Sequence, residues 1–241
     1  MKKMLPPLVL LIALWWCSSL IIDKPFFPTP DRVVLEMVQQ FLMGDLTSHL
    51  MTSLFRVFAA LVFSFFPALF LGIAAGRSPG FDSLISPAVY LLYPVPKVAL
   101  LPIILLFLGL GNFSKIFFVS LVVFFQFYLN LRDETAGISR QYFDSLTSLG
   151  GSKRNELRHI ILPALMPRIF SSLRMTLGTA IAILFLAETF ATRRGIGWYI
   201  MDAWSRIAYT EMYTGILALS LAGFLLFLIL DLSETFFCRW K

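Results

Sequence analysis

Residue types that carry enzymatic or metal chemistry are few in this sequence and lie far apart. The two histidines, His49 and His159, lack the spacing of metal ligands, and the two cysteines, Cys17 and Cys238, imply no disulfide framework. No serine, histidine and acidic residue form a recognisable nucleophile motif, and no Gly-x4-Gly-Lys-Ser/Thr phosphate loop is present. The sequence therefore predicts no catalytic residue, no metal ligand and no cofactor-binding residue in this chain.

Charge is concentrated in the segment from Gln141 to Pro163, which interrupts a very hydrophobic chain. Its acidic residues, Asp144 and Glu156, are interpreted as loop charges rather than a catalytic pair. Its basic residues form a dense cluster, and between membrane spans such a cluster indicates the cytoplasmic side. The cluster comprises Lys153, Arg154 and Arg158 within the segment, with Arg140 and Arg168 beside it.

Local patterns within this segment predict two short helices separated by a break. Apolar residues at helical spacing predict the first helix over residues 142–149. Gly150-Gly151 suits a helix C-terminus followed by a tight turn. Ser152 can cap the second helix, which we expect Pro163 to limit. A charged helix-turn-helix of this kind suits the docking of a soluble partner, and an ordinary solvated loop is the alternative.

The rest of the sequence predicts an all-α integral membrane protein. The chain has 241 residues, of which 58% are hydrophobic and 14% charged, and its mean hydropathy is +0.81. Soluble domains carry about 25% charged residues. The formal charge of +6 is attributed to loops beside apolar runs, so no nucleic-acid partner is expected. Six transmembrane helices are predicted at about 5–22, 54–75, 84–108, 115–131, 169–188 and 216–232, with a cytoplasmic loop at about 132–168.

Six spans in one domain, residues 1–241, place both termini on the cytoplasmic side. Lys2 and Lys3 at one end, and Arg239 and Lys241 at the other, agree with that orientation. Between the first two spans, Asp31 to Met43 is apolar on one side and is predicted to form a helix that ends at Gly44. This helix either lies on the surface at the outer membrane–water boundary or is an ordinary packed extracytoplasmic helix.

Polar residues within the spans are the candidates for a translocation pathway. Prolines break the third span. Broken membrane helices often line a pathway, and the alternative is that the prolines only bend the helix so that it packs against its neighbours. Glu188 is costly at membrane depth unless it is paired or wetted, and an ion pair with Arg193 or Arg194 is an equal alternative to substrate contact. Arg56 is expected to reach the membrane interface. The candidate pathway residues are Tyr93, Gln126, Thr179 and Glu188; hydrogen bonding between helices is the other use for Gln126 and for Asn130.

The spacing of the charged segment resembles the EAA loop of bacterial ABC importer permeases. Asp144-Ser145-Leu146 occupies the Glu-Ala-Ala positions, Gly150 the glycine, and Ile160-Ile161-Leu162-Pro163 the end of the motif. The triplet departs from the family, since aspartate, serine and leucine replace its residues. The proline-rich stretch from Tyr93 to Pro102 looks like that of the nitrate/sulfonate/taurine branch.

The resemblance implies a permease subunit that forms the pathway for a small solute. The solute would be a nitrate-, sulfonate- or taurine-like anion or a thiamine-precursor-like compound. The implied partners are ABC ATPase subunits, which bind ATP and Mg, a second permease copy or related chain, an extracytoplasmic solute-binding protein, and lipid of the bacterial inner membrane. The implied ATPase-docking residues are Asp144, Ser145, Leu146, Gly150, Gly151, Ile160, Leu162 and Pro163. An integral-membrane lipid-modifying enzyme or a passive channel is the alternative function.

Overall fold

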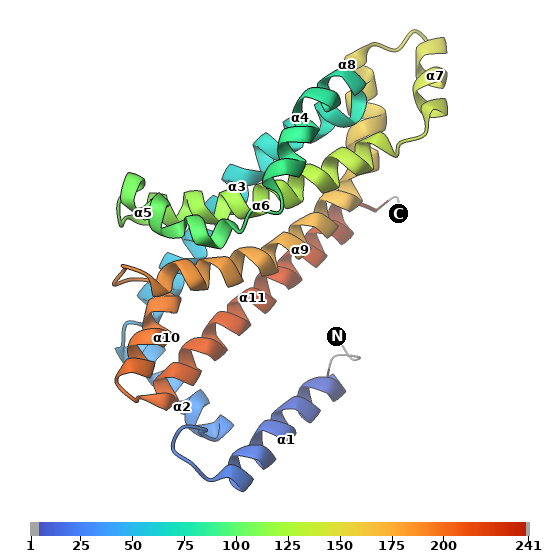
Figure 1. Ribbon diagram of the computed structural model, residues 1–241. Helices are drawn as coiled ribbons and strands as arrows, with labels where there is room; N and C mark the ends of the chain where they lie inside the picture. Colours follow the sequence, from blue (N-terminus) through green and yellow to red (C-terminus); the bar gives the residue numbers. More distant parts are fainter. Residues whose placement is uncertain (1–4, 240–241) are drawn as a thin grey trace. The chain divides into compact units, whose positions relative to one another are not determined.

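The computed structural model describes residues 5–239, and within them all regular secondary structure is helical, without strands (Figure 1). It forms two compact units. The first contains the described residues up to Phe55 together with Glu188–Ala222, and the second contains Arg56–Ala187 together with the described residues from Gly223 onward. Three of the residues that predict cytoplasmic termini are not among the described residues: Lys2, Lys3 and Lys241.

The first unit combines the N-terminal helices of the chain with helices from its last third. It comprises α1 (Leu5–Ile22), α2 (Pro30–Met43), the start of α3 (Leu46–Arg77), α10 (Ile196–Ser205) and the start of α11 (Tyr209–Phe237). Its core joins α3, α10 and α11 through Leu46, Ile196, Tyr199 and Ala218. The predicted helix is present as α2, with Gly44 as its C-cap residue, and its place at the membrane surface stays a prediction.

The second unit packs the rest of α3 and α11 with the central helices of the chain. These are α4 (Pro79–Leu92), a 3-10 turn (Lys97–Leu100), α5 (Leu101–Leu108), α6 (Asn112–Ala136), α7 (Arg140–Ser148), α8 (Lys153–Glu156), a π-helical turn (Leu157–Ile161) and α9 (Leu162–Thr189). Its core holds apolar side chains of α3, α6 and α9, including Ala60, Phe118, Phe127, Leu131, Leu165 and Leu184.

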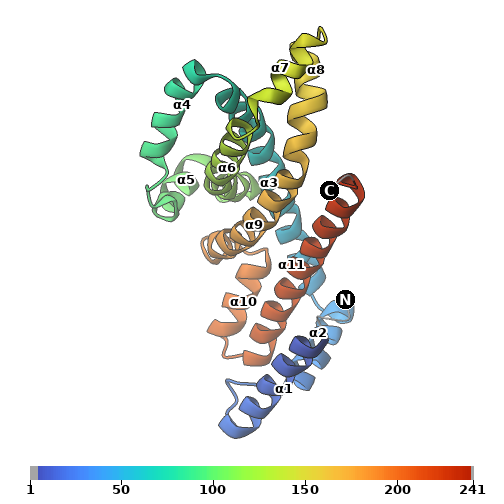
Figure 2. The ribbon, with the colours of Figure 1, turned by 90° about the vertical axis from the view of Figure 1, so that its right-hand side faces the viewer.

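The predicted break at the prolines of the third span is present. The helices Pro79–Leu92 and Lys97–Leu108 meet at an angle of 81° (Figure 2). Between them, Pro94 and Pro96 lie where the helical hydrogen bonding is interrupted. A proline cannot donate a backbone hydrogen bond, so the chain leaves the helix where two prolines follow closely.

Helix lengths and composition give four or five membrane-crossing elements among the described residues. α3, α6, the continuous helix Lys153–Thr189 and α11 are long and apolar enough to cross a bilayer, and the bent pair of α4 with the 97–108 stretch makes a fifth. α1 has the predicted bounds of 5–22 but is shorter than these helices.

The prediction that Pro163 limits the second helix of the charged segment is wrong. The chain stays helical from Lys153 to Thr189, and the π-helical turn Leu157–Ile161 ends two residues before Pro163. A proline ring in a helix clashes with the carbonyl one turn earlier, and a wider turn relieves that clash. Most of the 132–168 stretch is accordingly helical rather than an open loop. The second predicted span also differs, because α3 begins at Leu46 rather than at about residue 54 and includes polar residues in its first turns.

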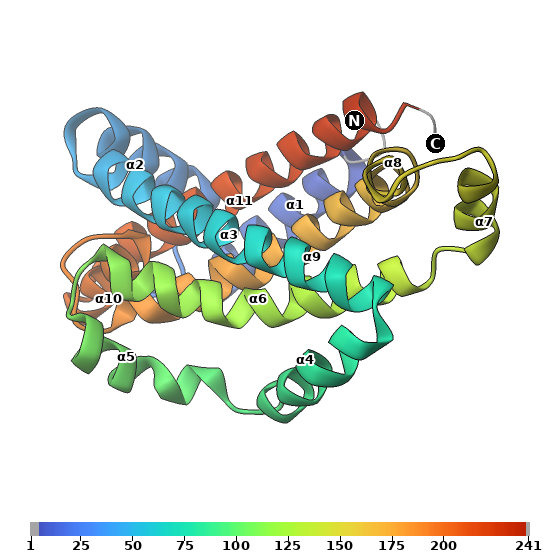
Figure 3. The ribbon, with the colours of Figure 1, turned by 90° about the horizontal axis from the view of Figure 1, so that it is seen from above.

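Two glycines let α3 and α6 approach closely along the second unit (Figure 3). A Cβ atom at Gly72 would lie 2.9 Å from the Cβ of Leu131, and one at Gly76 would lie 2.6 Å from the carbonyl oxygen of Arg132. These neighbours belong to, or lie next to, the α6 backbone, so they cannot move aside cheaply. The contact therefore requires glycine at the C-terminal end of α3.

We predict that Gly76→Ala destabilises the protein whereas Gly178→Ala does not. Overpacking costs about 1–3 kcal/mol, because α6 must shift away from the added methyl. Gly178 also lies in a helix, but apart from its chain neighbours and its own helix backbone no described atom lies within 4 Å of a Cβ there, so alanine only improves helix propensity. Thermal unfolding of the detergent-purified protein measures both changes, and equal melting temperatures for the two variants would contradict the prediction.

Candidate functional site

A polar pocket of about 230 Å³ lies within the second unit, between the end of α4, α6 and α9. Three of the four predicted pathway residues, which are distant in sequence, line it together. Its lining residues are Tyr93, Gln126, Leu129, Asn130, Met175, Thr176 and Thr179. The structure thus brings Tyr93, Gln126 and Thr179 to one cavity, while their contact with a substrate remains a prediction.

The polar groups of this pocket differ in how far they are already hydrogen-bonded. Asn130 Nδ2 donates to Ser172 Oγ at 2.9 Å, which confirms the predicted use of Asn130 in joining two helices. Thr176 Oγ1 donates to the Ser172 carbonyl at 2.8 Å. Within the part of the chain that the structure describes, the Gln126 amide has no hydrogen-bond partner. Gln126 is therefore able to bind a polar solute here, as is the hydroxyl of Tyr93, which also has no hydrogen-bond partner among the described residues.

Lys97 lies beside this region without lining the pocket. Its ammonium group donates to the carbonyl oxygen of Tyr93 at 2.7 Å and lies 4.5 Å from the ring centroid of Phe125. These contacts hold the segment after α4 in place, because Lys97 reaches back to the carbonyl four residues earlier.

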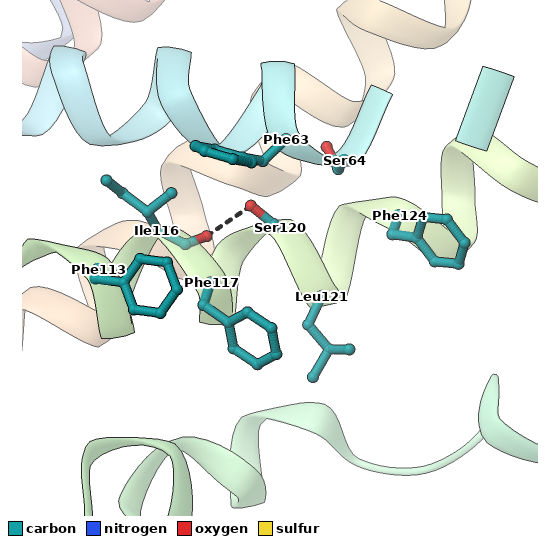
Figure 4. A pocket seen from close by; sticks show the side chains of 8 residues that line it. All are labelled: Phe63, Ser64, Phe113, Ile116, Phe117, Ser120, Leu121 and Phe124. Carbon is teal, nitrogen blue, oxygen red and sulfur yellow. Dashed lines mark hydrogen bonds between the residues drawn. The ribbon is translucent and has the colours of Figure 1, made fainter. Parts of the chain in front are cut away.

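A second pocket, of about 340 Å³, is apolar (Figure 4). It lies between α3 and α6 and is lined by Phe63, Ser64, Phe113, Ile116, Phe117, Ser120, Leu121 and Phe124. Its hydroxyls are already used: Ser120 Oγ donates to the Ile116 carbonyl at 2.7 Å, and Ser64 Oγ to the Ala60 carbonyl at 2.8 Å. The pocket therefore suits hydrocarbon rather than a polar solute.

Glu188, the fourth predicted pathway residue, is fully buried in the first unit and hydrogen-bonded to α10. Its carboxylate accepts from Ser53 Oγ at 2.8 Å and from the backbone N–H of Gly197 at 2.9 Å. Ser53 Oγ in turn accepts from the N–H of Ile196 at 2.8 Å. Substrate contact by Glu188, and its pairing with Arg193 or Arg194, stay predictions.

His49 completes the arrangement at the start of α10. Its Nδ1 accepts from the N–H of Gly195 at 3.2 Å, so three consecutive backbone N–H groups have side-chain acceptors. Helix N-termini leave such donors unsatisfied and favour negative charge nearby. Sequence reasoning missed His49 and Ser53, although their i, i+4 spacing places both on one face of α3.

Glycine is the one residue type that fits at position 195, directly before α10. Its φ of +115° lies in the region that favours glycine. A Cβ atom there would lie 2.3 Å from the carboxyl carbon of Glu188. The glycine thus allows the backbone to approach the carboxylate that caps the helix.

Arg56 does not reach an interface as predicted, because its side chain is buried with 3% of its surface exposed. Its Nε and Nη2 atoms donate to Asn112 Oδ1 at 3.0 and 2.7 Å. Lys115, also buried, donates to the Leu110 carbonyl at 3.0 Å. The two cations hold the turn between α5 and α6, where Gly109 has a φ of +77°.

Arg206 joins the end of α10 to the start of α11. Its guanidinium contacts Asp202 and Glu211, each at 2.8 Å. The hydrogen bonds that the Arg206 guanidinium donates to the Glu211 and Asp202 carboxylates raise the pKa of Arg206. Half-exposed pairs of this kind add little stability, so Arg206 orients the connection rather than holding the unit together.

The segment predicted to dock the ATPase, called the docking loop below, consists of α7, α8 and the turn between them, and it has the predicted break. Gly150 adopts a φ of +76°, and the N–H of Gly151 donates to the Leu146 carbonyl at 2.9 Å, which closes the end of α7. Ser152 Oγ accepts from the N–H of Asn155 at 3.4 Å, which confirms the predicted cap.

Surface exposure separates the predicted docking residues into two groups. Asp144, Ser145 and Gly150 are exposed, as are the neighbouring Tyr142 and Leu149, the latter with 85% of its surface accessible. The others are half-buried or lie in the turn: Leu146, Gly151, Ile160, Leu162 and Pro163. The exposed group can meet a partner directly, whereas the others shape the loop.

The fold is that of ABC transporter permeases. The chain matches a structure of the MetNI methionine ABC transporter in inward-facing conformations, with a TM-score of 0.68 and 18% identity, over 82% of this chain and 96% of that one. It also matches a bacterial ABC transporter that imports alginate, with a TM-score of 0.64 and 18% identity, over 97% of this chain and 94% of that one.

Sequence comparison narrows this class to one family. Residues 68–240 match the binding-protein-dependent transport system inner membrane component family. The taurine transport system permease protein of Escherichia coli is 31% identical over 91% of this chain and 82% of that protein. A Bacillus subtilis protein, provisionally named as an aliphatic sulfonates transport permease, is 29% identical over all of this chain and 88% of its own length.

The chain belongs to the binding-protein-dependent transport system inner membrane component family. It is a transmembrane permease subunit of an ATP-driven ABC importer and contributes to the translocation pathway. This finding disfavours the alternatives of a lipid-modifying enzyme and a passive channel.

We predict that Ser53→Ala destabilises the first unit while Ser64→Ala is nearly neutral. Both serines are buried on α3, but Ser64 donates only to carbonyls of its own helix. Ser53→Ala removes the acceptor of a buried N–H and a donor to a carboxylate, which costs about 1–3 kcal/mol.

Limited proteolysis at residues 190–208 and the melting temperature measure the effect of the serine variants. Ser53→Ala should expose this stretch to protease at a lower temperature than the wild type. Indistinguishable cleavage of the two variants would show that the hydrogen bonds to α10 do not hold it in place.

Proposed function

We propose that this chain transports a small sulfonate-type anion, such as taurine, across the bacterial inner membrane. Support comes from relatives named for taurine and for aliphatic sulfonates. A further relative, 23% identical over 97% of this chain, is named for formylaminopyrimidine transport, so a thiamine-precursor-like compound is the second candidate. The observation that carries the proposal is the pocket that joins Tyr93, Gln126 and Thr179.

The pocket lining suits the transient passage of such an anion. It combines an unpaired amide at Gln126 with the hydroxyl of Tyr93 and contains no acidic side chain among its lining residues. Amide and hydroxyl groups can donate to sulfonate oxygens without the tight binding of a fixed positive charge. A transport pathway requires binding that is weak enough for release.

The proposed topology has six spans with both termini in the cytoplasm. The five membrane-crossing elements, together with the apolar helix α1, make six. An even number of spans returns the chain to the side on which it began, and the basic docking loop favours the cytoplasm for that side.

The proposed assembly contains two permease subunits, two ATPases and an extracytoplasmic solute-binding protein. ATP and Mg are bound by the ATPases, and this chain contributes no catalytic residue. The exposed Asp144, Ser145 and Gly150, with Tyr142 and Leu149, would meet the ATPase. Closure of the ATPases would then move the docking loops and tilt the spans between two states.

Reconstitution in proteoliposomes tests the proposed function. The permease, purified with its copurifying ATPase and supplied with its binding protein, should accumulate labelled taurine only when ATP is present. ATP-dependent uptake of the formylaminopyrimidine instead would select the second candidate, and the absence of any ATPase from the intact complex would overturn the proposed assembly.

We predict that Gln126→Leu lowers taurine uptake at least several-fold, because the pocket loses its unpaired amide. Gln126→Glu keeps the shape but adds a negative charge, so it should impair uptake of an anion further. Gln40→Leu on α2, where the amide donates to Glu36 at 2.9 Å, is the matched control. Initial uptake rates at saturating ATP measure these effects, and wild-type rates in both Gln126 variants would remove this residue from the pathway.

We predict that Gly150→Trp abolishes copurification of the ATPase, whereas Gly150→Asn retains it. Apart from its chain neighbours, no described residue has an atom within 4 Å of where a Cβ at Gly150 would lie, so a tryptophan there would project from the loop into the partner. Asparagine tolerates a positive φ better than most residues, which separates backbone strain from obstruction. Retention of the ATPase by Gly150→Trp would place its docking site elsewhere.

A further inference from the structure

We propose that Arg77 is a positioning residue that ties both halves of the docking loop to the end of α3. This inference rests on the proposed function, because it concerns how motion of the docked ATPase reaches the spans. Arg77 is the last residue of α3 and lies outside the charged segment from which the docking loop was predicted.

Two contacts of Arg77 reach opposite sides of the loop's turn. Its guanidinium carbon lies 3.5 Å from the ring centroid of Phe143 on α7, and its Nη2 lies 3.1 Å from Glu156 Oε2 on α8. Arginine is suited to this double role because its planar group stacks on an aromatic face while its edge binds a carboxylate.

Phe143 is the main attachment of α7. It is the one buried residue of this helix, with 5% of its surface exposed. The other α7 side chains are exposed or half-buried. A force applied to α7 by a partner therefore reaches the second unit chiefly at this ring and at the chain connections on either side.

The end of α3 that carries Arg77 is packed tightly against its neighbouring helices. Gly76, directly before it, packs against the backbone of α6 near Arg132. Arg132 Nε donates to Asp82 Oδ1 at 2.9 Å and so fastens α6 to the first turn of α4. Displacement of Phe143 is thus passed through Arg77 to three helices that are already joined to one another.

The exposure of the ion pair indicates a role in transmission rather than in folding. The Arg77 and Glu156 side chains are 34% and 22% exposed, and water screens such pairs so that they add little stability. Removing Arg77 should therefore leave the fold intact and loosen the link between α7 and α3.

The test compares transport per ATP hydrolysed in proteoliposomes of the intact complex. Arg77→Leu should retain the ATPase and lower this ratio several-fold. Arg168→Leu is the matched control, since Arg168 pairs with Glu134 at 3.3 Å but stacks on no aromatic ring of residues 5–239. A ratio equal to that of the wild type in Arg77→Leu would overturn the inference.

Conservative and exchanged variants separate positioning from a general structural defect. Phe143→Tyr should keep the ratio, and Phe143→Leu should lower it, because only the aromatic ring supports the guanidinium. The double variant with Arg77→Glu and Glu156→Arg should recover part of the ratio lost in Arg77→Glu alone. Equal ratios for Phe143→Tyr and Phe143→Leu, or no recovery in the double variant, would contradict the proposal.

Protease cleavage of the detergent-purified chain at residues 140–152 gives a readout that needs no ATPase. Arg77→Leu should speed this cleavage several-fold relative to Arg168→Leu, and equal cleavage would overturn the tie itself. If the wild-type complex contains no ATPase but the cleavage rates differ, the proposed docking function fails and the Arg77 tie stands.

Discussion

The constraint on which this structure depends is that backbone polar groups inside a membrane must be hydrogen-bonded within the protein. Helices meet that requirement along their length, and the departures from them show how the ends and breaks are handled. The chain leaves the helix at Pro94 and Pro96, and it widens into a π-helical turn before Pro163. At α10, where the helix begins inside the first unit, His49, Ser53 and Glu188 accept three successive N–H groups.

Polar side chains in this permease fall into two groups, those with hydrogen-bond partners in the protein and those without. Glu188, Arg56 and Lys115 are buried and bonded to backbone or side-chain groups that shape turns and helix ends. A buried charge is tolerable only with such partners. Gln126 differs, because its amide lines a pocket and is left without a partner among the described residues. That difference separates groups that support the fold from a group available to a passing solute.

Local sequence patterns predicted the local features well. The α2 helix ending at Gly44, the positive φ at Gly150 and the Ser152 cap all follow from residue preferences over a few positions. Proline was a poorer guide: it marked the break after α4 but did not end the helix at Pro163, because the preceding turn adapted. The predicted span also missed the first turns of α3, whose residues are polar. Packing of this part of α3 against α10 stabilises a helix there despite its low hydropathy.

The sequence by itself determined that this is a hydrophobic, helical chain with a charged segment that resembles the loop of a permease family, because composition, periodicity and motif spacing are properties of neighbouring residues. Only the tertiary structure decided which distant residues meet. It brought Tyr93, Gln126 and Thr179 to one pocket and placed Arg56 on Asn112 rather than at an interface. Such pairings depend on how helices cross, and close crossings such as that at Gly72 and Gly76 are set by the packing of whole helices.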